Sequence, residues 1–166
     1  MRLILRRWRE ADLDSLIRLA NNRRIWINLA DPFPHPYTHA DGQGWIALTA
    51  AEGDPQLQFA IDVDGQAIGG IGLKRLPEQH PQSLEVGYWV GEPYWGRGIA
   101  SEALARVTEY AFNKLGAERV QAQVFAYNLA SARVLEKNGY TLEGRLRRAA
   151  RKDGQIIDKL MYSIIA

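Results

Sequence analysis

A glycine-containing turn between a strand pattern and a helix pattern is the feature that most constrains this chain. Alternating apolar residues predict a strand over residues 83–90, and apolar residues at helical spacing predict an amphipathic helix over residues 100–115. Between them stands Trp95-Gly96-Arg97-Gly98-Ile99-Ala100. Its two glycines permit positive φ angles and a close approach of a ligand to the backbone. Because the first amides of a helix have no acceptor within it, the turn is a candidate site for a phosphate or pyrophosphate.

Two familiar phosphate-binding motifs do not fit this turn. A Walker loop needs a lysine followed by serine or threonine after its second glycine, where this chain has Ile99 and Ala100. A dinucleotide fingerprint needs a third glycine or alanine, where this chain has Ser101. A tight turn that binds no ligand stays open as an alternative.

The remaining pattern alternates strands and helices along one chain. Helices are predicted over residues 10–20, 25–29 and 130–137 and after the N-cap residue Thr38. Strands are predicted over residues 2–8, 57–63, 67–76, 119–125, 140–148 and 156–164. Asp64-Gly65 and Asp153-Gly154 supply hairpin turns, and the glycines at positions 69, 70 and 72 indicate a bulge or a close backbone contact. This order predicts an α+β fold in a single domain, residues 1–166.

Composition excludes several classes of protein. The chain has no cysteine, which rules out a disulfide framework, a thiolate zinc site and a cysteine nucleophile. No metal-ligand spacing appears, so we expect no metal. The basic segment 145–152 lacks aromatic residues for base stacking, so we expect no nucleic acid partner. No apolar run is long enough for a membrane span and no secretory signal pattern is present, so we expect a cytoplasmic protein without a membrane partner.

Several ordered motifs carry a resemblance to a known family. Gly98-Ile99-Ala100 matches the second half of the cofactor motif Gln/Arg-x-x-Gly-x-Gly/Ala. Further matches are Pro34-His35-Pro36-Tyr37-Thr38, Glu85-Val86-Gly87-Tyr88-Trp89, Asn128-Leu129-Ala130-Ser131 and Glu136-Lys137-Asn138-Gly139-Tyr140. The chain resembles the GNAT superfamily of N-acetyltransferases, and Trp95 in place of Gln or Arg is similar to its Rim-type, ribosomal-protein branch. The resemblance implies a central mixed, mostly antiparallel sheet that is splayed into a V and flanked by helices.

The resemblance also implies an acetyl-coenzyme A site in that V. Backbone groups of one arm would hold the pantetheine, the Gly-rich turn would hold the pyrophosphate, and an amide near Val90 would stabilise the oxyanion. The cofactor-binding residues implied are Tyr88, Trp89, Val90, Trp95, Gly96, Arg97, Gly98, Ile99, Ala100, Ser101, Asn128 and Ser131. Apart from the family, Asn128 and Ser131 also have the spacing of helix-capping residues.

Two residues are the predicted catalytic groups. Glu85 is the candidate base, because a carboxylate in an otherwise apolar strand needs a reason to be there, although an arginine partner is an equal alternative. Many family members carry an acid tyrosine where this chain has Leu135, and some carry a glutamate where it has Gln123. Ser131 is therefore the first candidate donor of a proton to the leaving thiolate, Tyr88 the second and water the third.

The implied reaction is direct attack of a primary amine on acetyl-CoA through a tetrahedral intermediate. Branch resemblance favours a protein N-terminal α-amine as acceptor, with Trp26, His35 and Tyr37 as substrate-binding candidates. A small amine, such as an antibiotic, polyamine or amino-acid derivative, is an alternative acceptor. The departures at Leu135 and Gln123 leave a non-catalytic acyl-CoA-binding module open, and a homodimer stays open as an assembly.

Overall fold

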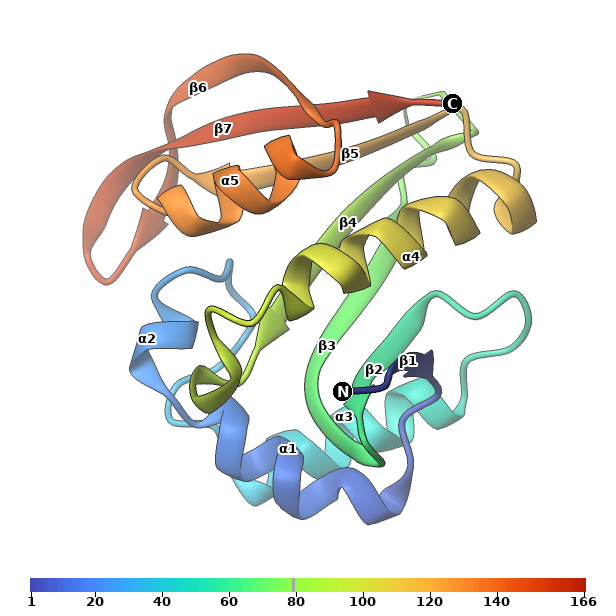
Figure 1. Cartoon of the computed structure of the whole chain (residues 1–166). Helices are drawn as coiled ribbons and strands as arrows, with labels where there is room; N and C mark the ends of the chain where they lie inside the picture. Colours follow the sequence, from blue (N-terminus) through green and yellow to red (C-terminus); the bar gives the residue numbers. More distant parts are fainter. Residues whose placement is uncertain (79) are drawn as a thin grey trace.

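The computed structural model describes residues 1–78 and 80–166, and Figure 1 shows them as one sheet with helices on both faces. The strands are β1 (Leu3–Arg6), β2 (Gln58–Val63), β3 (Gln66–Arg75), β4 (Ser83–Val90), β5 (Arg119–Phe125), β6 (Thr141–Lys152) and β7 (Gln155–Ile165). The helices are α1 (Leu13–Ala20), α2 (Arg23–Trp26), α3 (His39–Ala50), α4 (Ile99–Leu115) and α5 (Leu129–Lys137). Two short 3-10 turns, Glu10–Asp12 and Glu92–Tyr94, precede α1 and α4. The predicted α+β class is confirmed.

The sheet is mixed, and its strands follow the order β1-β2-β3-β4-β5-β7-β6. All neighbouring pairs are antiparallel except β4 and β5, which are parallel. The register between β4 and β5 ends at Glu85 opposite Gln121, so the two strands pair over their first residues and then separate. Figure 1 shows them side by side near the C-terminus and diverging toward α2. The predicted V is confirmed.

Helices cover the two faces of the sheet with separate apolar clusters. The larger cluster packs α4 residues at helical spacing, including Leu104 and Val107, against strand residues such as Leu84 and Val86. The smaller cluster joins Leu16 of α1 to the opposite face. These clusters hold α4 and α5 on one face of the sheet and α1 on the other (Figure 1).

Local signals explain most element boundaries. Thr38 caps α3 through a reciprocal capping box with Asp41, and Gly116 ends α4 in the left-handed conformation. The helix predicted over 25–29 instead spans Arg23–Trp26, because the Asn22 side chain accepts from the Arg24 amide and starts it earlier. At Gly69 a Cβ atom would lie 2.3 Å from the carbonyl oxygen of Trp89, and the β2–β3 register shifts nearby. The predicted close contact and bulge are therefore both present.

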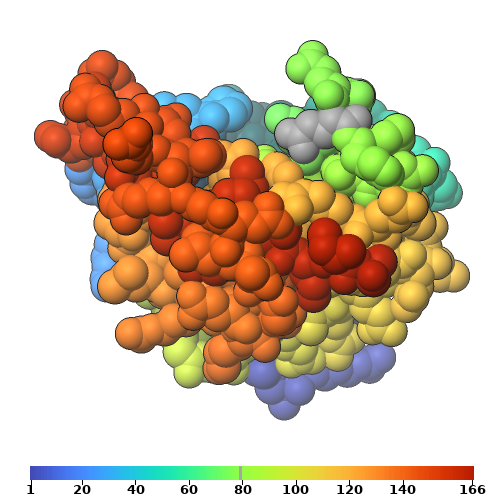
Figure 2. Space-filling view, turned by 90° about the horizontal axis from the view of Figure 1, so that it is seen from above, coloured from blue at the N-terminus to red at the C-terminus, as the bar shows by residue number. Residues whose placement is uncertain are grey.

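The β6–β7 hairpin reaches over to the α2 segment. Its buried Lys152 places Nζ 3.0 Å from Asp31 and 4.0 Å from the ring centroid of Trp26. Arg23 pairs with Asp153 in the turn of the hairpin. Figure 2 shows the hairpin in orange and red, with its tip at the upper left beside light-blue atoms of the α2 segment. These contacts hold the α2 segment across the open side of the V. None of the helices in the described ranges is both long and apolar enough to cross a membrane.

Candidate active site

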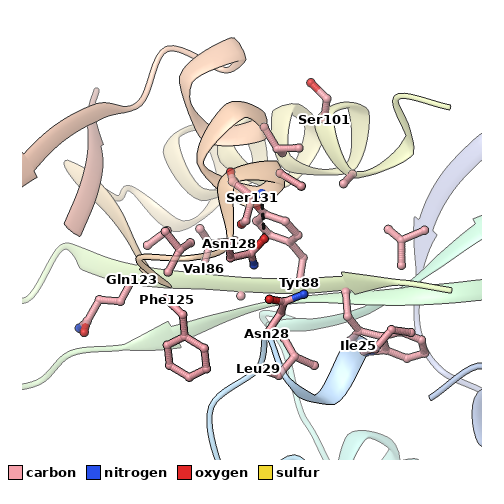
Figure 3. Close-up of a pocket in the computed structure, with 18 of the residues that line it drawn as sticks. Ile25, Asn28, Leu29, Val86, Tyr88, Ser101, Gln123, Phe125, Asn128 and Ser131 are labelled. Carbon is pink, nitrogen blue, oxygen red and sulfur yellow. Dashed lines mark hydrogen bonds between the residues drawn. The ribbon is translucent and has the colours of Figure 1, made fainter. Parts of the chain in front are cut away.

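A cavity of about 860 Å³ occupies the V between β4 and β5. Its wall comes from both strands, the Gly-rich turn, the first turns of α4 and α5, and the α2 segment. Figure 3 shows Asn128 and Ser131 on one side of the strands and Asn28, Leu29 and Phe125 on the other. The cavity therefore connects the two faces of the sheet through the gap in it.

The Gly-rich turn presents a row of free backbone donors to this cavity. Gly96 and Gly98 have φ angles of 75° and 76°, and a Cβ added at either would meet no atom within 4 Å. Among the described residues, the amides at positions 96–101 donate to no protein acceptor. Six successive free amides at the start of a 17-residue helix concentrate positive potential at one point. This arrangement of free donors is suited to an anion.

Two side chains of the turn have positions that its sequence did not predict. The indole nitrogen of Trp95 donates to the Val90 carbonyl at 2.7 Å and ties the turn to the end of β4. The guanidinium of Arg97 lies 5.6 Å from the ring centroid of Tyr94, and Arg97 is not part of the cavity wall. The wall does include Tyr88, Trp89, Val90, Trp95, Gly96, Gly98, Ile99, Ala100, Ser101, Asn128 and Ser131.

The end of β4 turns backbone groups toward the gap. The Gly91 amide bonds the Ile68 carbonyl at 2.8 Å, on the β3 side. Because successive amides of a strand point to opposite edges, those of Val90 and Tyr88 face the V. Beyond Glu85 no strand within residues 1–78 and 80–166 pairs with that edge, so these amides are available to an extended ligand.

Ser131 and Tyr88 meet across the V. Asn128 caps α5 by accepting from the Ser131 amide at 3.2 Å, which fixes the first turn of the helix and the Ser131 side chain with it. The Ser131 hydroxyl lies 2.8 Å from the Tyr88 hydroxyl, and Figure 3 shows the two residues next to each other with Asn128. Burial raises the pKa of Tyr88 to about 12, against a smaller lowering by the hydrogen bond to Ser131. Tyr88 is therefore a protonated phenol at neutral pH.

Glu85 lies at the point where the two strands separate. Its carboxylate accepts from the side-chain amides of Gln121 at 3.0 Å and of Gln123 at 3.2 Å. Within the described part of the chain no arginine forms an ion pair with it, so the alternative of an arginine partner is wrong. The half-buried carboxylate thus has neutral donors on one side and the cavity on the other. Leu135 is fully buried in the core and has no access to the cavity.

The predicted acceptor residues lie behind the cavity wall and not in it. The rings of Trp26 and His35 are 5.6 Å apart, and Tyr37 is buried in the smaller apolar cluster. The α2 side of the wall is instead made by Arg24, Ile25, Asn28, Leu29 and Ala30. The local sequence of that segment does not identify these residues as part of the wall. Their position depends on the contacts of the β6–β7 hairpin with the segment.

Comparison with known proteins identifies the family. The profile of the acetyltransferase (GNAT) domain matches residues 2–141. The chain belongs to the GNAT acetyltransferase family. The predictions of a GNAT fold and of an N-acetyltransferase of this family are confirmed.

Matches to similar proteins cover different shares of this GNAT chain and of its relatives. It is 39% identical over 100 residues to the uncharacterized N-acetyltransferase YoaA of Bacillus subtilis, a match that covers 60% of this chain and 56% of YoaA. It is 29% identical to the uncharacterized N-acetyltransferase p20 of Bacillus licheniformis, over 99% of this chain and 93% of p20. The chain thus spans little more than half the length of YoaA and nearly all of p20.

A solved structure supports the Rim-type resemblance. The structure of Mycobacterium smegmatis RimJ in complex with CoA-disulfide superposes with a TM-score of 0.86 at 27% identity, covering 99% of this chain and 82% of RimJ. The resemblance to the Rim-type branch is confirmed. That structure contains a coenzyme A moiety in the form of a CoA-disulfide.

Proposed function

We propose that this GNAT protein transfers the acetyl group of acetyl-CoA to a primary amine that enters the cavity from the α2 side. One observation carries the proposal: a single cavity joins the free amides at the start of α4 to the Glu85 carboxylate through the gap between β4 and β5. The donor would lie on the α4–α5 side and the acceptor beside Glu85. Both substrates then reach the same gap from opposite faces of the sheet.

The donor is held by backbone groups. The amides of residues 96–101 bind the pyrophosphate, and the free edge of β4 at Tyr88 and Val90 pairs with the pantetheine arm. Acetyl-CoA supplies an activated thioester carbonyl. The Val90 amide, which faces the V, donates to the carbonyl oxygen as it gains negative charge. Trp95 supports this geometry because its indole donates to the Val90 carbonyl, which lies on the same edge of β4 as the Val90 amide, and so fixes the end of the strand.

Glu85 acts as the base for the incoming amine. The amides of Gln121 and Gln123 hold its carboxylate in one orientation toward the cavity. An α-amino group, with a pKa of roughly 7.7–8.0, is already partly neutral near pH 7.5, so one carboxylate with a bridging water is sufficient. A lysine side chain, at about 10.4, would require much more help from its surroundings. This difference favours α-amines.

Ser131 and Tyr88 return a proton to the leaving thiolate. The Tyr88 hydroxyl can donate to the Ser131 oxygen, which leaves the Ser131 hydrogen free to point into the cavity. The Tyr88 phenol is protonated at neutral pH, so the pair holds a proton for the thiolate. In many family members a tyrosine at the position of Leu135 would supply that proton. The acceptor that we favour is a protein N-terminal α-amine, supported by the similarity to RimJ.

Acetyl-CoA turnover with Glu85→Gln tests the proposal. We expect kcat/KM for N-terminal peptides to fall roughly a hundredfold or more, which is the usual worth of a general base, while acetyl-CoA affinity by calorimetry stays unchanged. Glu109→Gln, on an exposed position of α4, is the matched control and should behave as the wild type. If Glu85→Gln turned over at the wild-type rate, Glu85 would not be the base. Binding of acetyl-CoA without turnover of any N-terminal peptide, polyamine, aminoglycoside or amino acid would support a non-catalytic module instead.

A further inference from the structure

Four polar side chains form a row across the acceptor side of the sheet. They are Lys74 of β3, Glu85 of β4, Gln123 of β5 and Lys159 of β7, and all four line the cavity. Lys74 is paired directly opposite Glu85 in the β3–β4 register. Gln123 connects Glu85 at 3.2 Å to the ammonium of Lys159 at 3.4 Å. Directly opposed residues share a face, so the row lies on the Glu85 side of the sheet.

The charge of this row is unbalanced. Glu85 is the one carboxylate in the cavity wall among the described residues, whereas five wall residues are basic. Of these, Arg24 is paired with Glu92, and Arg133 and Lys137 belong to α5 on the donor side. Lys74 and Lys159 make no ion pair within the described ranges.

Two uncompensated ammonium groups therefore flank the proposed base, one on each side. A cavity of this kind attracts an anionic group and repels a second positive charge on the acceptor. Lys159 is the better placed of the two, because it is half-buried and tied to Glu85 through Gln123, whereas Lys74 is exposed.

We propose that the acceptor carries a carboxylate close to its primary amine, with the amine at Glu85 and the carboxylate at Lys159, while Lys74 adds positive charge on the other side of Glu85. The proposal rests on the proposed function and narrows its substrate class. The carboxylate can be the α-carboxylate of a free amino acid or an acidic side chain at the N-terminus of a peptide. A polyamine or aminoglycoside does not satisfy this row.

Matched acceptor pairs test the proposal. Leucine against leucinamide reports on an α-carboxylate, and C-amidated peptides beginning with Asp against Asn report on an acidic side chain. We expect kcat/KM to favour the carboxylate member about tenfold or more in at least one pair, as a charge-assisted hydrogen bond typically provides, with spermidine the poorest acceptor. The pair that responds identifies the source of the carboxylate.

Lys159→Met and Lys74→Met remove the charges and retain the apolar stems. In the double variant the preference should shrink to within about threefold, while acetyl-CoA affinity is unchanged. Lys114→Met, at an exposed position of α4 outside the cavity, should retain the full preference.

Three results overturn the proposal. Equal rates within both pairs would do so, as would an unchanged preference in the double variant. Efficient spermidine acetylation would also reject it, although that result would support the proposed acetyl transfer. Absence of turnover with every amine, together with retained acetyl-CoA binding, would instead reject the proposed function and this inference with it.

Discussion

The Tyr88 hydroxyl lies 2.8 Å from the Ser131 hydroxyl and joins β4 to the first turn of α5 across the gap between the strands. Each residue is held independently. Tyr88 is fixed by its strand and by burial, and Ser131 is fixed by the Asn128 cap. The pair therefore presents hydroxyl groups to the cavity in a geometry that does not depend on a bound ligand.

Removing either hydroxyl should slow the reaction more than it weakens binding. We expect Ser131→Ala to lower kcat about tenfold to a hundredfold, because the leaving thiolate then relies on water, with acetyl-CoA affinity within about threefold of the wild type. Tyr88→Phe should lower kcat by a similar or smaller factor. If the two act as one unit, the double variant should be little worse than Ser131→Ala, which steady-state kinetics and a double-mutant cycle can measure.

Two conservative variants outside the cavity serve as controls for that cycle. Tyr110→Phe removes a hydroxyl that bonds the Gln56 carbonyl, and Ser15→Ala removes one that bonds the Asp12 carbonyl. Both should retain wild-type kcat. An unaltered kcat in Ser131→Ala would exclude Ser131 from the mechanism, and fully additive losses would contradict the coupling of the pair.

The raised pKa of Tyr88 predicts that the protein loses stability at alkaline pH. Burial raises this pKa to about 12, above the ordinary tyrosine value of 10.0, so folding favours the protonated phenol. This contribution to stability is complete below pH 10 and is lost as pH rises through about 12. Between pH 9 and pH 11 the unfolding free energy of the wild type should fall by about 1 kcal/mol more than that of Tyr88→Phe. Urea titrations near pH 9 and pH 11 measure the difference, and equal losses in both proteins would refute it.

The donor side of the site was largely predictable from the sequence. The alternation of residues 83–90, the glycines at 96 and 98 and the following helical period are local signals, and each acts within a few residues. They place a strand, a free set of amides and a helix in a fixed order whatever the rest of the chain does.

The acceptor side depends on contacts between distant residues. Lys74, Gln123 and Lys159 become neighbours of Glu85 only through strand pairing and contacts across the sheet. The family resemblance implies that the Arg97 side chain contributes to the cofactor site, but its guanidinium lies by the Tyr94 ring. Side-chain direction of that kind is set by packing and is not encoded in the spacing of a motif.

A negative charge at the second residue of α4 should separate cofactor binding from stability. Ala100→Glu places a carboxylate where a helix dipole stabilises it, so the thermal midpoint should be unchanged or slightly raised. The same charge would repel the pyrophosphate, and we expect acetyl-CoA affinity to fall about a hundredfold or more. Ala100→Gln is the near-isosteric neutral control and should lose far less. Calorimetry measures both variants, and equal affinities for Glu and Gln would place the anion elsewhere.

Gly87 offers a direct test of where the acceptor lies. It shares the face of Glu85 in β4, is paired with Gly72, and a Cβ added there would meet no atom within 4 Å. Gly87→Val should therefore be tolerated by the fold, since valine suits a strand better than glycine, yet fill space that the acceptor needs. We expect the acceptor KM to rise about tenfold or more with acetyl-CoA affinity unchanged.

Gly144→Val, at an equally open strand position in β6, is the control and should leave both constants unaltered. An unchanged acceptor KM in folded Gly87→Val would move the acceptor away from Glu85, and an equal loss of acetyl-CoA affinity would assign this face to the donor.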